Sequence, residues 1–466
     1  MPLRLVLFLL AFLPGLSGWA QPSSADTLPR PRIRFRDAFL KGQMRGSFRT
    51  FLMATDNAPG LSDPYALAAG GGLHFETAPW RGFGLGIGGA FNFNLLSSDL
   101  SRRDPATNAA NRYEIGLFDV ENPQNRRDLD RLEEFWLRYA HKRTRITLGQ
   151  QLLQTPFVNH QDGRMRPTAE KGIWAENTAL PHTRIQVGWL WQMSPRSTVR
   201  WYSVSTSIGL YPQGLNPDGT RSGYQSQLSS QGIGLLGISR SWGQRLKVQA
   251  WDQYVQNIFN TAFIQADYEH ALRKQGHLLL GLQFTRQDAL HEGGNPDVDK
   301  TYFQPGGQSN TLSAQLGWKG GRWQALGAYT RVTADGRFLS PREWGREPFY
   351  TFMSRERIEG SGDSHSLTGR LRWQGPRENL RLEAAYGHFY LPDVNRTDLS
   401  KYAFPSFRHL NLEARYSFRG ALQGLQAQLL YVWKGQMGDV YGRRNLIIHR
   451  VNMSQYNVVL NYLYGG

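Results

Sequence analysis

A two-residue alternation of apolar with small or polar side chains recurs through this sequence, and it restricts the chain to extended strands. In residues 83–95, Leu85, Ile87 and Phe91 share one side, whereas the other side carries glycine, alanine and asparagine. Alternate side chains of a β-strand lie on opposite faces, so this segment predicts a strand with one apolar and one small or polar face. The same pattern recurs within residues 134–139, 184–191, 262–269, 280–285, 312–318, 410–418, 425–433 and 455–464.

Composition favours a membrane barrel over a soluble sheet protein. Trp, Tyr and Phe number 14, 20 and 24 of 466 residues, and many stand at strand ends, where lipid headgroups favour amphipathic rings. No run approaches roughly 18 consecutive apolar residues, which excludes helical spans. The absence of Cys excludes disulfide scaffolds and iron–sulfur proteins. We predict an all-β fold, a transmembrane antiparallel β-barrel of about 18 strands; a soluble sandwich or small barrel is the alternative.

The N-terminus is typical of an exported protein. Arg4, the apolar run of residues 5–13 and the small residues Gly18 and Ala20 predict a signal peptide over residues 1–20. A buried helix is the alternative. Residues 21–40 interleave Pro with Arg and are predicted to form a periplasmic leader, either mobile or plugging the lumen. Residues 41–466 then form the barrel domain. Short turns alternate with long polar stretches, the layout of outer-membrane barrels; the long stretches are residues 97–131, 154–172, 288–309, 333–364, 391–407 and 435–450.

Residues 148–172 resemble a motif of the OprD family of outer-membrane porins. A strand ending in Leu-Gly-Gln-Gln leads into Thr155-Pro156, and residues 162–167 read Asp-Gly-Arg-Met-Arg-Pro. Gln150 stands where the family usually has Arg, and Lys171 where an acidic residue is common. Residues 68–89, 194–196, 251–266 and 342–351 carry further similarity. The resemblance implies 18 strands, one pore per chain, a third loop folded inward as the constriction, and uptake of small, often carboxylate-bearing solutes by a monomer or weak homotrimer.

The first candidate site is the predicted constriction loop. Asp162, Arg164 and Arg166 place opposite charges within five residues of a loop bounded by prolines. A charged ring at a narrow point focuses the electric field and selects solutes by charge. The alternative is that these residues pair with the barrel wall and hold the loop in place.

The second candidate is a basic ladder on the pore wall. Arg370 and Arg372 alternate with apolar Leu371 and Trp373, and Arg381 lies on the next strand. Arginine facing lipid near mid-membrane would cost roughly 2–4 kcal/mol, so we expect all three to face the lumen. The resemblance implies a row of wall arginines that guides carboxylates. Ion pairing with Glu383 and Glu413 is the alternative.

The third candidate is a second pore loop that contains Arg342, Glu343, Arg346 and Glu347. Neighbouring aromatic residues, such as Trp344, predict packing rather than full solvation. We expect this loop to enter the pore mouth opposite the constriction loop. An external loop that contacts lipopolysaccharide is the alternative.

These features together predict a porin for passive, partly selective diffusion of small carboxylate-bearing or amino-acid-like solutes across a Gram-negative outer membrane. An export channel and, with less support, a barrel enzyme are the alternatives. Asp363, His365 and Ser366 lie close in sequence, but a catalytic triad is defined in space and these residues stand in a Gly/Ser loop, so we expect no catalysis. We expect no metal, because the 11 His lack metal-ligand spacing, and no cofactor. The net charge of +17 is spread through loops and suits anionic lipid and solutes rather than nucleic acid. Expected partners are membrane lipid, lipopolysaccharide and the barrel assembly machinery.

Overall fold

The chain forms one closed antiparallel β-barrel. The structure is a computed structural model that describes residues 34–161, 163–273 and 276–464. β1 pairs with both β2 and β19, which closes the sheet into a ring. Of the 19 strands in these described residues, β8 pairs only with β7 through two residue pairs, so 18 strands form the ring. The predicted fold class and strand number are therefore confirmed.

The ring strands are about 8 to 15 residues long, as tilted membrane-crossing strands require. Their bounds are β1 Gln43–Asp56, β2 Tyr65–Glu76, β3 Phe83–Ser97, β4 Arg131–His141, β5 Thr144–Gln151, β6 Ala169–Asn177, β7 Thr183–Ser194, β9 Ile233–Trp242, β10 Leu246–Val255, β11 Phe259–Leu272, β12 Gly276–Ala289, β13 Gln308–Gly320, β14 Trp323–Val332, β15 Ser364–Gln374, β16 Leu380–Tyr390, β17 Phe407–Ser417, β18 Leu425–Gln436 and β19 Met453–Tyr464. The minor elements are α2 Phe35–Leu40, η1 Glu114–Leu117, β8 Tyr202–Ser203, α3 Val204–Ser207, η2 Val298–Lys300, η3 Gly420–Leu422 and η4 Arg444–Leu446.

The alternating sequence pattern translates directly into an apolar outside and a polar inside. On β12, Leu282 is 66% exposed on the outer face, whereas its neighbour Gln283 is 4% exposed on the inner face. Gln283 donates to Gln265 of β11, so inward-facing amides of adjacent strands bond to each other. Bulges shift the register at three places, including Gly88/Gly89 of β3. Within the described ranges, no helix has both the length and the apolar character needed to cross a bilayer.

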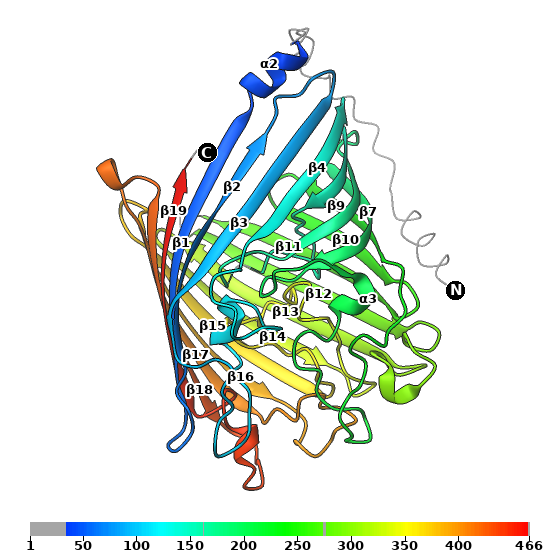
Figure 1. The fold of residues 1–466 in the computed structure, drawn as a ribbon, viewed down its shortest axis with the longest axis vertical. Coiled ribbons are helices and arrows are strands. Elements are labelled where there is room, and N and C mark those ends of the chain that lie inside the picture. The colour runs from blue at the N-terminus through cyan, green and yellow to red at the C-terminus, as the bar shows by residue number, and fades with distance from the viewer. Residues whose placement is uncertain (1–33, 162, 274–275, 465–466) are drawn as a thin grey trace.

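The two ends of the barrel differ in their connections. One end, which we call the short-turn end, carries connections such as residues 142–143 and 321–322, together with α2 and the C-terminal end of β19 (Figure 1). The other end carries the long loops, which match the predicted stretches within a few residues. Sequence analysis missed one long loop, residues 195–232, which contains β8 and α3. Residues 34–40 of the predicted leader lie at the rim, and residues 1–33, with the predicted signal peptide, lie outside the described residues.

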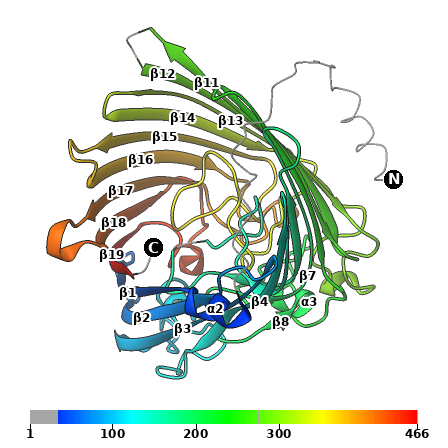
Figure 2. The same ribbon diagram turned by 90° about the horizontal axis from the view of Figure 1, so that it is seen from above.

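The main apolar core lies inside the ring. Figure 2 shows loops crossing the interior of the barrel. Phe157 and Trp344 of two long loops pack with inward-facing wall residues such as Trp251, Phe263 and Phe389. Loops folded into a barrel this way bury apolar side chains that would otherwise face water. The core therefore fixes the position of the loops relative to the wall.

The assignment of faces can be tested with one matched pair of substitutions. Leu282→Arg places a charge on the lipid face, whereas Gln315→Arg places one at the same depth inside, because Gln315 pairs with Gly281 across β12 and β13. We expect Leu282→Arg to lower the free energy of unfolding by about 2–4 kcal/mol. Gln315→Arg should lower it by less than about 1 kcal/mol. Urea unfolding in lipid vesicles measures both, and equal losses would contradict the assigned register.

Candidate functional site

Two long loops meet inside the barrel through one buried asparagine. Asn159 belongs to the β5–β6 loop, residues 152–168, and Trp344 and Arg346 belong to the β14–β15 loop, residues 333–363. The Asn159 backbone NH donates to the Trp344 carbonyl at 3.1 Å. Its side-chain amide donates to the Arg346 carbonyl at 3.0 Å and accepts from the Arg346 NH at 3.1 Å. The side chain thus pairs with a backbone as a β-bridge would and joins the two loops.

The β14–β15 loop also contacts several wall strands. The Tyr350 hydroxyl donates to Asp267 of β11 at 2.7 Å. Arg370 of β15 donates to the Phe352 carbonyl at 2.9 Å. Trp344 is fully buried and donates to Ser207 at 2.8 Å. Asp267 and Arg370 belong to wall strands and Ser207 belongs to the β7–β9 loop, so the β14–β15 loop lies inside the ring rather than projecting outside.

The charged residues predicted on this loop mostly stabilise the loop itself. Arg342 pairs with Glu359 at 2.6 Å and lies over the ring of Tyr402. Glu343 accepts from the backbone NH groups of Gly209 and Tyr211 at 3.0 and 2.9 Å, which ties the β7–β9 loop to this one.

Arg346 and Glu347 are also in contact with the loop. Arg346 lies 5.0 Å from the ring of Phe352. Glu347 accepts from the Ile358 NH at 2.8 Å, and burial raises the pKa of this carboxyl to about 7. Arg346 and Glu347 therefore each contact another residue of the same loop, which keeps the loop compact.

Arginines hold the backbone of the β5–β6 loop. Arg355 donates to the Gly163 carbonyl at 3.0 Å, and Arg196 donates to the Gln161 carbonyl at 3.1 Å. Arg49 of β1 donates to the carbonyl of Arg164 at 2.6 Å. A carbonyl satisfies a guanidinium NH without neutralising its charge. Three guanidinium groups thus bond to the backbone of this one loop.

The predicted constriction residues occupy different environments. Asp162 lies outside the described residues. Burial and the neighbouring Arg355 lower the pKa of Arg164 to about 9, and burial and Arg131 lower that of Arg166 to about 9. Both therefore stay charged at neutral pH. Arg166 donates to the Leu129 carbonyl at 2.6 Å and so holds the β3–β4 loop.

Some guanidinium groups in this cluster have hydrogen-bonding capacity left. Arg164 is buried and Arg196 is half-buried, and within the described part of the chain no acceptor bonds to the Nε atom of either. Burial and the nearby Arg164 lower the pKa of Arg196 well below its usual value. A buried donor without an acceptor is costly, so this cluster favours an added oxygen acceptor.

The predicted ladder residues all face the lumen. Arg370 and Arg372 lie 3.3 and 2.8 Å from Glu383. Arg381 lies 3.0 Å from Glu413, which also pairs with Arg415 of the same strand. The ion pairs considered as the alternative are thus present. Four guanidinium groups share two carboxylates, which leaves an excess of two positive charges on this wall.

Four arginines near the site were not predicted as site residues: Arg49, Arg196, Arg355 and Arg415. The alternation of residues 45–49 could have predicted that Arg49 faces inward. The alternation of residues 410–418 does predict that Arg415 faces inward, although not that it belongs to the site. Arg355 offers no such signal, because it lies in an irregular loop with a φ of +79°. A non-glycine residue in the left-handed region costs roughly 1–3 kcal/mol and persists where surrounding contacts hold it, here with Gly163 and Asn457.

A closed antiparallel barrel with a polar interior and inward-folded loops defines a channel of the outer-membrane type. The sequence model described as "outer membrane porin, OprD family" matches residues 82–357, more than half of the chain. This chain therefore belongs to the OprD family of outer-membrane porins, as the motif at residues 148–172 indicates.

Solved structures show the same fold. OpdK of Pseudomonas aeruginosa, crystallised with vanillate, is 15% identical with a TM-score of 0.70, and the match covers 92% of this chain and 100% of OpdK. OccAB1 of Acinetobacter baumannii is 12% identical with a TM-score of 0.70, covering 92% and 97%. OccK9 (OpdG) of Pseudomonas aeruginosa is 14% identical with a TM-score of 0.70, covering 91% and 99%. A search of curated proteins gave no match.

Family membership gives the location and the general activity of the protein. It resides in the outer membrane of a Gram-negative bacterium and gives small solutes a passive route across it. The short-turn end then faces the periplasm and the long loops face the exterior, as in other outer-membrane barrels.

The contact between the two loops can be tested at Asn159. Asn159→Ala removes the side-chain bonds to Arg346 and leaves part-buried backbone groups without this partner, at up to about 1–3 kcal/mol each. We expect larger and noisier single-channel conductance steps. Asn125→Ala is the matched control, because among the described residues the Asn125 side chain bonds only to Asp128 of its own loop. Identical conductance in both variants would show that this contact does not restrict the pore.

Proposed function

We propose that this porin favours small solutes that carry a carboxylate. The observation that carries the proposal is the excess of guanidinium groups over carboxylates on the pore wall. Arg370, Arg372, Arg381 and Arg415 share the two carboxylates of Glu383 and Glu413. Clefts of one charge sign raise the local concentration of solutes of the opposite sign.

The chemistry of arginine suits capture followed by release. A guanidinium can bind a carboxylate through two parallel NH donors, and it is more weakly hydrated than an ammonium. The Nε atoms of Arg164 and Arg196 supply donors at the loop contact, and Arg370, Arg372 and Arg381 supply others on the wall. Several modest sites allow a solute to enter and still to leave.

The relatives support the same solute class. OpdK is described with vanillate, an aromatic carboxylate. The constriction role of the β5–β6 loop, with Asp162, Arg164 and Arg166, belongs to this proposal, as does the pore-lining role of the β14–β15 loop. We assign Arg166 a positioning role within it, since its bond to Leu129 directs it to the β3–β4 loop.

We further propose that the protein has no catalytic activity. The one sequence cluster that resembles a hydrolase site, Asp363, His365 and Ser366, is not assembled as one. His365 is exposed and bonds to the Tyr329 hydroxyl at 2.6 Å, whereas Ser366 is buried on the opposite face of β15. Asp363 pairs with Arg331. We also propose contacts with lipopolysaccharide and the assembly machinery, as a monomer or weak homotrimer.

The charge of the ladder can be tested by electrophysiology. Arg370→Ala with Arg372→Ala should lower the anion-over-cation permeability ratio about fivefold, because losing roughly 1 kcal/mol of attraction changes the local anion concentration by that factor. Reversal potentials of purified protein in a planar bilayer under a salt gradient measure the ratio. Arg377→Ala is the control, since Arg377 is exposed in the β15–β16 turn.

Unchanged reversal potentials in the double variant would refute the proposal that the ladder arginines attract anions. Addition of benzoate and of benzylamine to the same bilayers tests the solute class directly. We expect benzoate to interrupt the current of the wild type, with shorter interruptions in the double variant. Block by benzylamine alone would contradict the proposal.

A further inference from the structure

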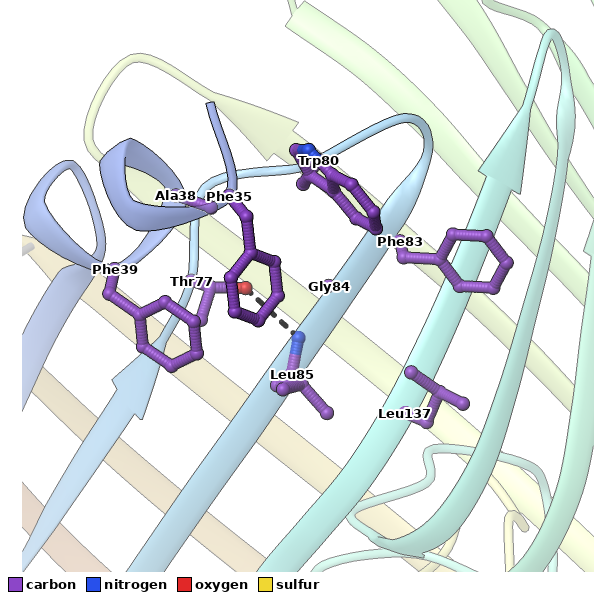
Figure 3. Close-up of a pocket in the computed structure, with 9 residues that line it drawn as sticks. All are labelled: Phe35, Ala38, Phe39, Thr77, Trp80, Phe83, Gly84, Leu85 and Leu137. Carbon is purple, nitrogen blue, oxygen red and sulfur yellow. Dashed lines mark hydrogen bonds between the residues drawn. The ribbon is translucent and has the colours of Figure 1, made fainter. Parts of the chain in front are cut away.

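An apolar groove lies on the outer surface of the barrel at the short-turn end. It has a volume of about 300 Å³ and is formed where α2 meets the start of β3. Figure 3 shows the rings of Phe35 and Phe39 on one side and Trp80 and Phe83 on the other. The volume falls within the roughly 300–1,000 Å³ range of ligand pockets. The lining residues are Phe35, Ala38, Phe39, Thr77, Trp80, Phe83, Gly84, Leu85 and Leu137.

The groove is held in shape by specific contacts. Phe35 and Phe39 are four residues apart and so share one face of α2, with ring centroids 5.3 Å apart. Phe35 also contacts Trp80 edge to face at 5.3 Å. The Ala78 NH donates to the Ala38 carbonyl at 2.9 Å and fastens α2 to the β2–β3 turn. These contacts make the groove a built feature of the rim.

The groove opens toward the membrane rather than the lumen. Phe83, Leu85 and Leu137 are 43%, 41% and 42% exposed on the outward, lipid-facing side of β3 and β4. Because the short-turn end faces the periplasm, this groove lies at the level of the inner leaflet of the outer membrane. That leaflet consists of phospholipid, so a phospholipid acyl chain is the apolar group available to fill it.

Exposed basic residues lie on both segments that form the groove. Arg34 precedes α2, Arg36 belongs to it and Lys41 follows it. Arg81 lies in the β2–β3 turn, with its guanidinium 5.3 Å from the ring centroid of Trp80. Asp37 is the one acidic residue among residues 34–41. Basic groups beside an apolar surface at the headgroup level attract anionic lipid.

We propose that this groove binds an anionic glycerophospholipid of the periplasmic leaflet. One acyl chain lies between Phe35, Trp80 and Leu85, and the phosphate lies against Arg36 and Arg81. The bound lipid would hold α2 against the barrel. This site is separate from the lumen and does not depend on the solute that the porin carries.

Native mass spectrometry of the full-length protein, purified in detergent, tests the proposal. Phosphatidylglycerol and phosphatidylethanolamine with identical acyl chains are added in turn. We expect one phosphatidylglycerol to bind at least tenfold more tightly than phosphatidylethanolamine. Arg36→Ala with Arg81→Ala should weaken this binding by about tenfold or more, as expected for two basic groups at an anionic headgroup.

Two further variants keep the test decisive. Arg322→Ala removes an arginine beside Trp323 in the β13–β14 turn, where the described residues form no helix. This variant should bind lipid as the wild type does. Phe35→Ala with Phe39→Ala should weaken the binding of both lipids, since this double variant lacks one wall of the groove. Heat-modifiable gel mobility confirms that each variant is folded.

Several results would overturn the proposal. Equal affinity for the two lipids would show that the arginines do not select an anionic headgroup. Equal loss of binding in the Arg322→Ala variant would show general charge attraction rather than a site. A several-fold gain in lipid binding upon deletion of residues 21–33 would show that this segment, not lipid, occupies the groove.

Discussion

The need to satisfy every backbone polar group inside a bilayer governs this structure. No water is present there to bond an open strand edge, so the first and last strands must pair. Met53 of β1 faces Asn457 of β19 in a register that extends over eleven residue pairs. Once the ring is closed, alternate side chains have no choice but to face lipid or lumen, and the two-residue sequence pattern decides which set faces which.

The interior then poses a second problem, because long loops with polar backbones enter a confined space. Side chains act as backbone partners there: Asn159 pairs with Arg346, and arginines bond to the carbonyls of Gln161, Gly163 and Arg164. The position of the β5–β6 loop therefore depends on arginines that come from β1, the β7–β9 loop and the β14–β15 loop.

On the outer surface, at the periplasmic rim, a short helix adds to the apolar face of the barrel. The aromatic residues expected at a headgroup level do not simply form a belt, because α2 brings Phe35 and Phe39 over the start of β3. A short segment that sequence analysis treated as a leader thereby becomes part of the membrane-facing surface. Its arginines lie where an anionic headgroup would lie.

Sequence alone determined the fold class, the strand number, the family and the inward direction of Arg370, Arg372 and Arg381, because strand alternation in a bilayer has only two outcomes and the motif at residues 148–172 is specific. It did not determine how the loops meet. Arg355, Arg196 and Asn159 lie far apart in the chain and follow no periodicity, so their contacts exist only once the ring brings their loops together. Nor could the sequence decide whether the ladder arginines pair with Glu383 and Glu413. The strand register decides this, since it places Arg372 opposite Glu383 and Arg381 opposite Arg415, so that several arginines lie close to each carboxylate.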